Sequence, residues 1–136
     1  MKRISEKMTR DVMTRGVVTT HADASVAEIA NMLTNQHVSG VTVVSTYGDV
    51  LGFISEMDVL KVLNKPDLKR IVAEDVISSR LVSIAPNATI GLAAKIMDEK
   101  QVHRLLVLSE KRSGSAQRPV GLLSASDIMR MVAGTG

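Results

Sequence analysis

Two serines and two aspartates occur in the same pattern at two places in the chain. The pairs are Ser55 with Asp58 and Ser124 with Asp127, each aspartate following its serine by three positions. A glycine and two large apolar residues precede each serine, and apolar residues at helical spacing follow. The pattern predicts a strand, a sharp turn and a helix that begins at the serine.

The serine and the aspartate can serve the helix or a ligand. A serine at a helix start accepts a backbone N–H, and an acid three residues later reaches back to the serine's own N–H. Free N–H groups and a hydroxyl at a helix start also suit a phosphate. A carboxylate accepts hydrogen bonds from the vicinal hydroxyls of a ribose. The two roles are compatible, because the second carboxylate oxygen remains available, and the duplication favours a ligand role.

A basic residue follows each aspartate after three further positions. These residues are Lys61 and Arg130. We expect i,i+3 ion pairs with the aspartates, or plain exposure, more readily than contacts with a phosphate.

Several kinds of chemistry are excluded or not indicated. The chain has no cysteine, so disulfides, thiolate metal sites and cysteine nucleophiles are excluded. His21 and His37 have no carboxylate companions at metal-ligand spacing, and no P-loop or nucleophile–base pattern occurs. The sequence therefore predicts neither an enzyme nor a metal site.

Charge and hydropathy limit the partners. The 17 basic and 14 acidic residues give a net charge of +3, which permits an anionic ligand but does not specify DNA. Tyr47 and Phe53 are the only aromatic residues, which argues against base stacking. No apolar run approaches the roughly 18 residues that a membrane span needs, and the start lacks a signal region. We expect a cytoplasmic protein with no membrane partner and no nucleic-acid partner.

The chain is an internal repeat. A shift of 64 residues aligns Asp11 with Asp75 and continues without a gap to Ser45 and Ser109. The serine–aspartate blocks then align at a shift of 69, so the second copy has a longer loop before its block. We place repeat 1 at residues 8–64, a linker at 65–74 and repeat 2 at 75–133.

Each repeat reads as β-α-β-β-α. Ser25 and Thr89 cap the first helices, and a hairpin leads to each serine–aspartate block. The expected strands are 17–19, 41–44, 50–54, 81–83, 105–108 and 120–123, with closing helices to about residue 64 and over 126–132. The predicted fold class is α/β (α+β). One repeat gives a thin core, so we expect two repeats packed as one module with pseudo-twofold symmetry.

In this order and duplicated, the motifs resemble a tandem pair of cystathionine-β-synthase-type (CBS) domains, a Bateman module, over residues 8 to 133. The resemblance rests on Asp11-Val12-Met13-Thr14, Val38-Ser39-Gly40, Val102-His103-Arg104-Leu105 and the two serine–aspartate blocks. The sequence departs from the family at two prolines. Thr42 and Leu106 replace a strand proline, and Ala22 stands where repeat 2 has Pro86.

The resemblance implies a regulatory module that binds adenosine-containing ligands in clefts between the repeats. One cleft would combine Ser78, Val82, Val102 and His103 with Ser55 and Asp58. The other would combine Thr14, Val18, Val38 and Ser39 with Ser124 and Asp127. In both, the aspartate would hold ribose hydroxyls, the valines would border the base, and the serines would approach the ribose or phosphate.

The two implied clefts differ in charge. His103 and Arg104 could neutralise a phosphate in the first cleft, whereas their counterparts Ser39 and Gly40 carry no charge. The hypothesis is that AMP, ADP or ATP prefers the first cleft. The second would bind weakly, bind adenosine or S-adenosylmethionine, or stay empty. The alternative for His103 and Arg104 is an exposed pair at a strand edge.

The nearly continuous apolar helices after Ser55 and Ser124 predict a homodimer. Because the chain shows no effector domain, we expect a stand-alone sensor that signals to a partner protein in trans. Two alternatives remain. One is a structural or protein-interaction dimer whose clefts are vestigial, and the other is a nucleic-acid-binding protein that uses the basic loop at 111–118.

Overall fold

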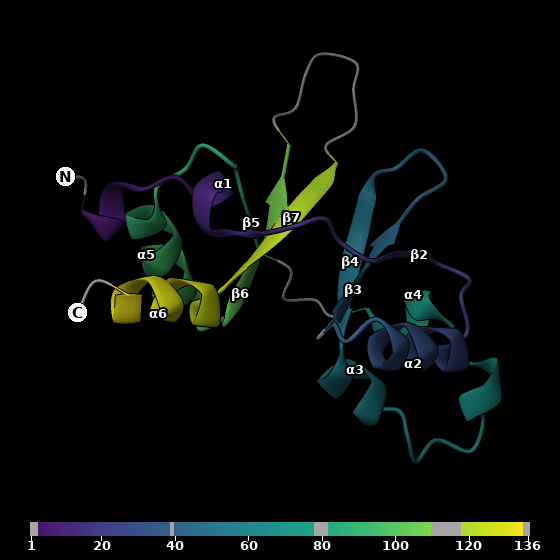
Figure 1. The fold of residues 1–136 in the computed structure, drawn as a ribbon. Helices are drawn as coiled ribbons and strands as arrows, with labels where there is room; N and C mark the ends of the chain where they lie inside the picture. The colour runs from purple at the N-terminus through teal and green to yellow at the C-terminus, as the bar shows by residue number, and fades with distance from the viewer. Residues whose placement is uncertain (1–2, 39, 78–81, 110–117, 135–136) are drawn as a thin grey trace. The chain divides into compact units, whose positions relative to one another are not determined.

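The computed structural model describes residues 3–38, 40–77, 82–109 and 118–134. The chain divides into two compact units (Figure 1). Residues 17–81 form one, which we call the first-repeat unit. Residues 1–16 together with 82–136 form the other, the second-repeat unit.

The first-repeat unit is a three-stranded sheet with helices. Its strand order is β2-β3-β4, and the bounds are β2 Thr19–His21, β3 Gly40–Val44 and β4 Val50–Ser55. Strands β2 and β3 are parallel and are joined by helix α2 (Val26–Asn35), whereas β3 and β4 form an antiparallel hairpin. Helix α3 (Glu56–Leu60) follows β4 directly. Helix α2 begins at Ser25, whose Oγ accepts a hydrogen bond of 3.1 Å from Glu28 N.

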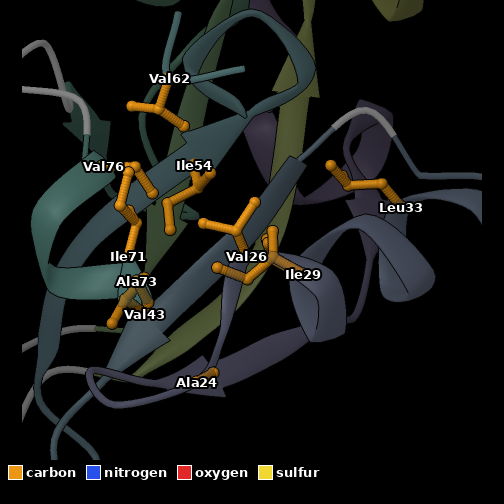
Figure 2. Packing of buried hydrophobic residues seen from close by; sticks show 11 residues of the cluster. Ala24, Val26, Ile29, Leu33, Val43, Ile54, Val62, Ile71, Ala73 and Val76 are labelled. Carbon is orange, nitrogen blue, oxygen red and sulfur yellow. The ribbon is translucent and has the colours of Figure 1, made fainter. Parts of the chain in front are cut away.

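The core of this unit lies between one face of the sheet and the helices (Figure 2). Alternate strand residues Val41, Val43 and Ile54 are fully buried and pack with Ile29 of α2. Two short elements complete the core, the 3-10 helix η2 (Leu68–Arg70) and helix α4 (Ala73–Val76). The buried cluster consists of Ala24, Val26, Ile29, Leu33, Val41, Val43, Ile54, Val62, Ile71, Ala73 and Val76.

The second-repeat unit has a four-stranded sheet in the order β1-β7-β6-β5. The strands are β1 Thr14–Arg15, β5 Ser83–Ile84, β6 Arg104–Leu108 and β7 Pro119–Ser124. The helices are η1 Ile4–Glu6, α1 Thr9–Val12, α5 Ile90–Lys100 and α6 Ala125–Gly134. The buried cluster consists of Ile84, Ile90, Ala93, Met97, Leu105, Val107, Leu123 and Ile128.

The predicted β-α-β-β-α order is confirmed in both units, with differences at element ends. Strands β2 and β5 begin two residues later than predicted. Helix α3 ends at Leu60 instead of continuing to about Asn64. The chain tightens there into i→i+3 bonds, such as Val62 N to Val59 O at 3.1 Å, which leave Val62 in the core. Strand β1 was not predicted.

The segment before each repeat's first strand packs with the other repeat. In the second-repeat unit, Thr9 N donates to Ala88 O at 2.8 Å. In the first-repeat unit, the equivalent bond joins Ala73 N to Ala24 O at 2.8 Å. We call residues 8–14 and 72–77 the leading segments. The compact units therefore group the chain differently from the repeat boundaries at 8–64 and 75–133.

The leading segments explain the glycine of each serine–aspartate block. A Cβ on Gly121 would lie 2.6 Å from the carbonyl oxygen of Thr14, and a Cβ on Gly52 would collide with the side chain of Ile77. Thr14 and Ile77 belong to the leading segments that cross β7 and β4. Gly121 is thus required by the close approach of another backbone segment, whereas Gly52 makes room for the Ile77 side chain.

Candidate functional site

Ser55 and Asp58 form a reciprocal capping box at the start of α3. Asp58 Oδ2 accepts hydrogen bonds from Ser55 N at 2.8 Å and from Ser55 Oγ at 2.9 Å. Asp58 N donates to Ser55 Oγ at 3.3 Å. Asp58 is only 8% exposed, and the box fixes its orientation. The helix-cap interpretation of this block is therefore confirmed.

The second oxygen of Asp58 has a weak partner. Asp58 Oδ1 lies 3.9 Å from Lys61 Nζ, and the Lys61 side chain is 72% exposed. An exposed ammonium at this distance contributes little. Asp58 Oδ1 is thus able to accept hydrogen bonds from ligand hydroxyls.

Ser124 and Asp127 repeat the arrangement at the start of α6. Asp127 Oδ2 accepts from Ser124 N at 2.9 Å, and Asp127 N donates to Ser124 Oγ at 3.1 Å. Asp127 is 6% exposed. Its Oδ1 is ion-paired with the guanidinium of Arg130. The predicted i,i+3 ion pairs of Lys61 and Arg130 are both confirmed, but the arginine engages its aspartate more closely.

Thr14 lies near the second box. Strand β1 pairs antiparallel with β7, and Thr14 stands opposite Leu122, two residues before Ser124. The structure therefore brings together three residues that were predicted to share a site, Thr14, Ser124 and Asp127. No strand was predicted at this place, because β1 is only two residues long.

The residues entering β6 also lie beside the second box. His103 O accepts a hydrogen bond of 2.8 Å from Ala125 N, and Arg104 pairs with Ser124 across β6 and β7. Both residues belong to the second-repeat unit, whereas Asp58 belongs to the first. Their expected shared site with Ser55 and Asp58 stays a prediction.

The predicted base-contacting valines occupy equivalent places in the two sheets. Val18 O accepts from Thr42 N at 2.9 Å, and Val82 O accepts from Leu106 N at 3.0 Å. Val18 and Val38 are half-buried against the first core, and Val82 and Val102 against the second. Ser39 and Ser78 lie outside the described residues.

A cavity of about 380 Å³ in the second-repeat unit escaped the sequence analysis. It lies between the end of α5 and the start of α6, and His103 lines it together with Val102 and Ala125. Its remaining lining residues are Ala94, Met97, Asp98, Gln101, Ile128 and Met129. The cavity depends on how the two helices pack, for which no local pattern exists.

Residues 3–38, 40–77, 82–109 and 118–134 contain no recognisable metal site and no membrane span. Within these ranges, no three His, Asp or Glu side chains are grouped so that they could hold a metal ion. No helix there has the length and hydropathy that crossing a bilayer requires.

Comparisons with known proteins identify the two repeats. The family model described as "CBS domain" matches residues 10–65 and again residues 72–134. An inosine-5'-monophosphate dehydrogenase of Rhodopirellula baltica is 29% identical over 114 residues, which are 84% of this chain and 20% of that enzyme. A homoserine O-acetyltransferase of Methanohalobium evestigatum is 24% identical over 131 residues, 95% of this chain and 25% of the enzyme. The chain spans a quarter or less of the length of these relatives.

Solved structures share the fold. The CBS domain pair of protein MJ0100, in complex with 5'-methylthioadenosine and S-adenosyl-L-methionine, has a TM-score of 0.82 and 21% identity, covering 96% of this chain and 99% of that one. The CBS domain of a bacterial CNNM/CorC family Mg²⁺ transporter, in complex with ATP, has a TM-score of 0.79 and 19% identity, covering 96% and 90%.

Proposed function

The chain belongs to the CBS-domain family as a pair of CBS domains, and from this premise we propose that it senses an adenosine-containing ligand. AMP, ADP, ATP and S-adenosylmethionine are the candidate ligands. The observation that carries the proposal is the set of partners of the two Asp58 carboxylate oxygens. Its Oδ2 is held by Ser55, and its Oδ1 is left with only a lysine at 3.9 Å. A buried, pre-oriented carboxylate oxygen suits the two hydroxyls of a ribose.

The proposed sites combine residues of both repeats. One uses Ser55 and Asp58 with Ser78, Val82, Val102, His103 and Arg104, and the other uses Ser124 and Asp127 with Thr14, Val18, Val38 and Ser39. The guanidinium of Arg104 and the imidazole of His103, both possible phosphate partners, favour a phosphorylated ligand in the first. The relatives with bound methylthioadenosine, S-adenosylmethionine and ATP support the ligand class.

The proposed output is a change in association with other proteins. Leu60 and Leu63 after Ser55 are 55% and 56% exposed, and Met129 after Ser124 is 58% exposed. Exposed apolar residues beside the boxes support a homodimer. A ligand that binds one arrangement more tightly would shift the population toward it, and a regulated protein in trans would read the shift.

A second candidate function is supported by Asp127. Its Oδ2 caps α6 and its Oδ1 is paired with Arg130, so helix stability alone accounts for this residue. If the same held for Asp58, the protein would be a protein-interaction dimer without a ligand.

Isothermal titration of nucleotide-stripped protein separates the two candidates. We expect AMP, ADP, ATP or S-adenosylmethionine to bind with about micromolar affinity. Asp58→Ala should weaken the tightest binding event about tenfold or more. Asp58→Asn, which keeps an acceptor for Ser55, controls for loss of the cap. Absence of binding heat with all four ligands would refute the sensor and leave the interaction dimer.

A further inference from the structure

The first-repeat unit has a glycine where the second-repeat unit has an arginine, and an aromatic ring accounts for the difference. Gly40 begins β3, and the shift of 64 residues puts Arg104 at the same place at the start of β6. A Cβ on Gly40 would lie 2.2 Å from Cζ and 2.4 Å from Cε1 of Phe53. The ring of Phe53 therefore lies over Gly40 and occupies the space that a side chain at position 40 would need.

The two hairpins pair in the same register, so these positions are truly equivalent. In the hairpin of β3 and β4, Gly40 pairs with Ser55 and Thr42 pairs with Phe53, which puts the four positions on one face of the sheet. The equivalent positions in the hairpin of β6 and β7 are occupied by Arg104, Leu106, Leu122 and Ser124. Glycine and phenylalanine in the first-repeat unit thus correspond to arginine and leucine in the second.

The ring of Phe53 lies where this face of the sheet is closed to water. Phe53 is 7% exposed, and Thr42 opposite it is fully buried. The hydroxyl oxygen of Thr42 has no hydrogen-bond partner among the residues that the structure describes. In the second-repeat unit, Leu122 and Arg104 are only half-buried. An anion at the start of β3 would therefore find neither a cation nor an accessible hydroxyl on this face.

We propose that Phe53 is a specificity-determining residue, because its ring makes the second proposed site select adenosyl ligands that carry no phosphate. The inference deepens the proposed function and rests on it, since that function assigns Val38, two residues before Gly40, to the site of Asp127. A phosphate beside the ring would lose water without gaining a countercharge, which is costly.

The ring also indicates which ligands the site accepts. A thioether at the 5' position of the ribose is uncharged, and sulfur packs favourably beside an aromatic ring. A sulfonium at the same position is a cation, which the face of an aromatic ring attracts. The expected ligand class is the 5'-thioadenosyl compounds, with methylthioadenosine and S-adenosylmethionine as the probes.

Two arginines adjoin residues of the second site without supplying the missing cation. The guanidinium of Arg130 is held by Asp127, which also makes this the weaker of the two proposed sites. Arg15 follows Thr14 in β1, and alternation along the strand directs their side chains to opposite faces. The Arg15 guanidinium is exposed and donates to Arg10 O at 3.3 Å.

The test exchanges the matched pair and measures affinities by titration calorimetry. All variants carry Asp58→Ala, which weakens the first site. In this background, methylthioadenosine and S-adenosylmethionine should bind at least about tenfold more tightly than ATP. Adding Gly40→Arg/Phe53→Leu, the pair of the second-repeat unit, should strengthen ATP binding about tenfold. This gain should be lost when Asp127→Ala is added. The matched control is Leu51→Val at an exposed position of β4, which should leave the affinities unchanged.

A reciprocal variant tests the ring itself and is independent of the folding of the exchange variant. Leu122→Phe keeps Arg104 but puts a ring at the position that Phe53 has in the first-repeat unit. In the Asp127→Ala background, it should weaken ATP binding at the first site about threefold or more, because the ring competes with the arginine for space. Leu122→Ile is its control and should bind ATP normally. Circular dichroism and urea unfolding establish that each variant is folded.

The outcomes separate this inference from the proposed function. Absence of binding of every ligand to the unmodified protein would remove the sensor function itself. Normal binding to the unmodified protein, with an unchanged ratio of ATP to methylthioadenosine affinity in the folded exchange variant, would overturn only the role of Phe53. Tighter binding of ATP than of S-adenosylmethionine in the Asp58→Ala background would do the same, as would a gain in ATP affinity that survives Asp127→Ala. If the exchange variant does not fold, unchanged ATP binding by Leu122→Phe decides against the proposal.

Discussion

Both units contain the same capping box, but the aspartate of the box has a different ion-pair partner in each. In the first-repeat unit, Asp58 Oδ1 faces an exposed lysine at 3.9 Å. In the second-repeat unit, Asp127 Oδ1 is held by the Arg130 guanidinium, which offers several donors in a fixed plane. The helix caps are thus equivalent while the carboxylates are not equally available. A duplicated motif can thus keep its helix-capping role in both copies while the second carboxylate oxygen stays available in only one.

The largest expected difference between the units concerns their motif glycines. Gly121→Ala should destabilise the protein by about 3 kcal/mol, because its Cβ meets the backbone oxygen of Thr14. Gly52→Ala should cost about 1 kcal/mol, since the Ile77 side chain in its way can rotate. Urea unfolding of both variants measures the free energies of unfolding. Equal losses in the free energy of unfolding would show that the two leading segments move aside equally easily.

The second-largest expected difference is in the effect of the two aspartates on ligand affinity. Asp58→Ala should weaken the tightest adenosyl ligand about tenfold or more, because a charged hydrogen-bond acceptor is lost. Asp127→Ala should change that affinity by less than about threefold. Titration calorimetry of both variants against ATP and S-adenosylmethionine measures the two effects. A larger loss from Asp127→Ala would reverse the assignment of the working site.

The helix caps should behave alike in the two units. Ser25 Oγ accepts from Glu28 N, and Thr89 Oγ1 accepts from Leu92 N, each at 3.1 Å. Ser25→Ala and Thr89→Ala should therefore each lower the free energy of unfolding by about 1 kcal/mol. Thermal and urea unfolding give both values. A loss confined to one variant would mean that the side-chain hydrogen bond of the other cap does not stabilise its helix.

The smallest expected effect comes from the basic residues beside the aspartates. Arg130→Ala frees Asp127 Oδ1 and should strengthen ligand binding at that site by up to about threefold. Lys61→Ala should leave binding at Asp58 nearly unchanged, because the ion pair is long and exposed. Calorimetric stoichiometry and affinity distinguish the two. Weaker binding on loss of Arg130 would instead make it a phosphate ligand.

Local patterns predicted the parts of this molecule that local forces determine. The caps at Ser25 and Thr89, the hairpins and the boxes at Ser55 and Ser124 follow from side chains within a few residues of one another. The ion pairs of Lys61 and Arg130 follow from helical spacing.

Long-range contacts produced what the sequence analysis missed. The pairing of Thr14 with β7 and the packing of residues 8–14 against residues 86–90 join segments far apart in the chain. One signal was present, since a glycine inside a strand, as at Gly52 and Gly121, marks the close approach of another segment of the chain. The cavity depends on helix packing, and the unequal ion pairs depend on the reach of lysine and arginine.

The leading segments bear on how such a chain could arise from a shorter ancestor. Each unit completes its core and hydrogen bonds with residues that precede the first strand of the other repeat, as Thr9 does with Ala88 and Ala73 with Ala24. A polypeptide with a single repeat would lack this contribution unless a second molecule supplied its own leading segment. Two such molecules that exchanged their leading segments would form the same pair of units. Gene fusion would then convert this exchange between two molecules into an exchange within one chain.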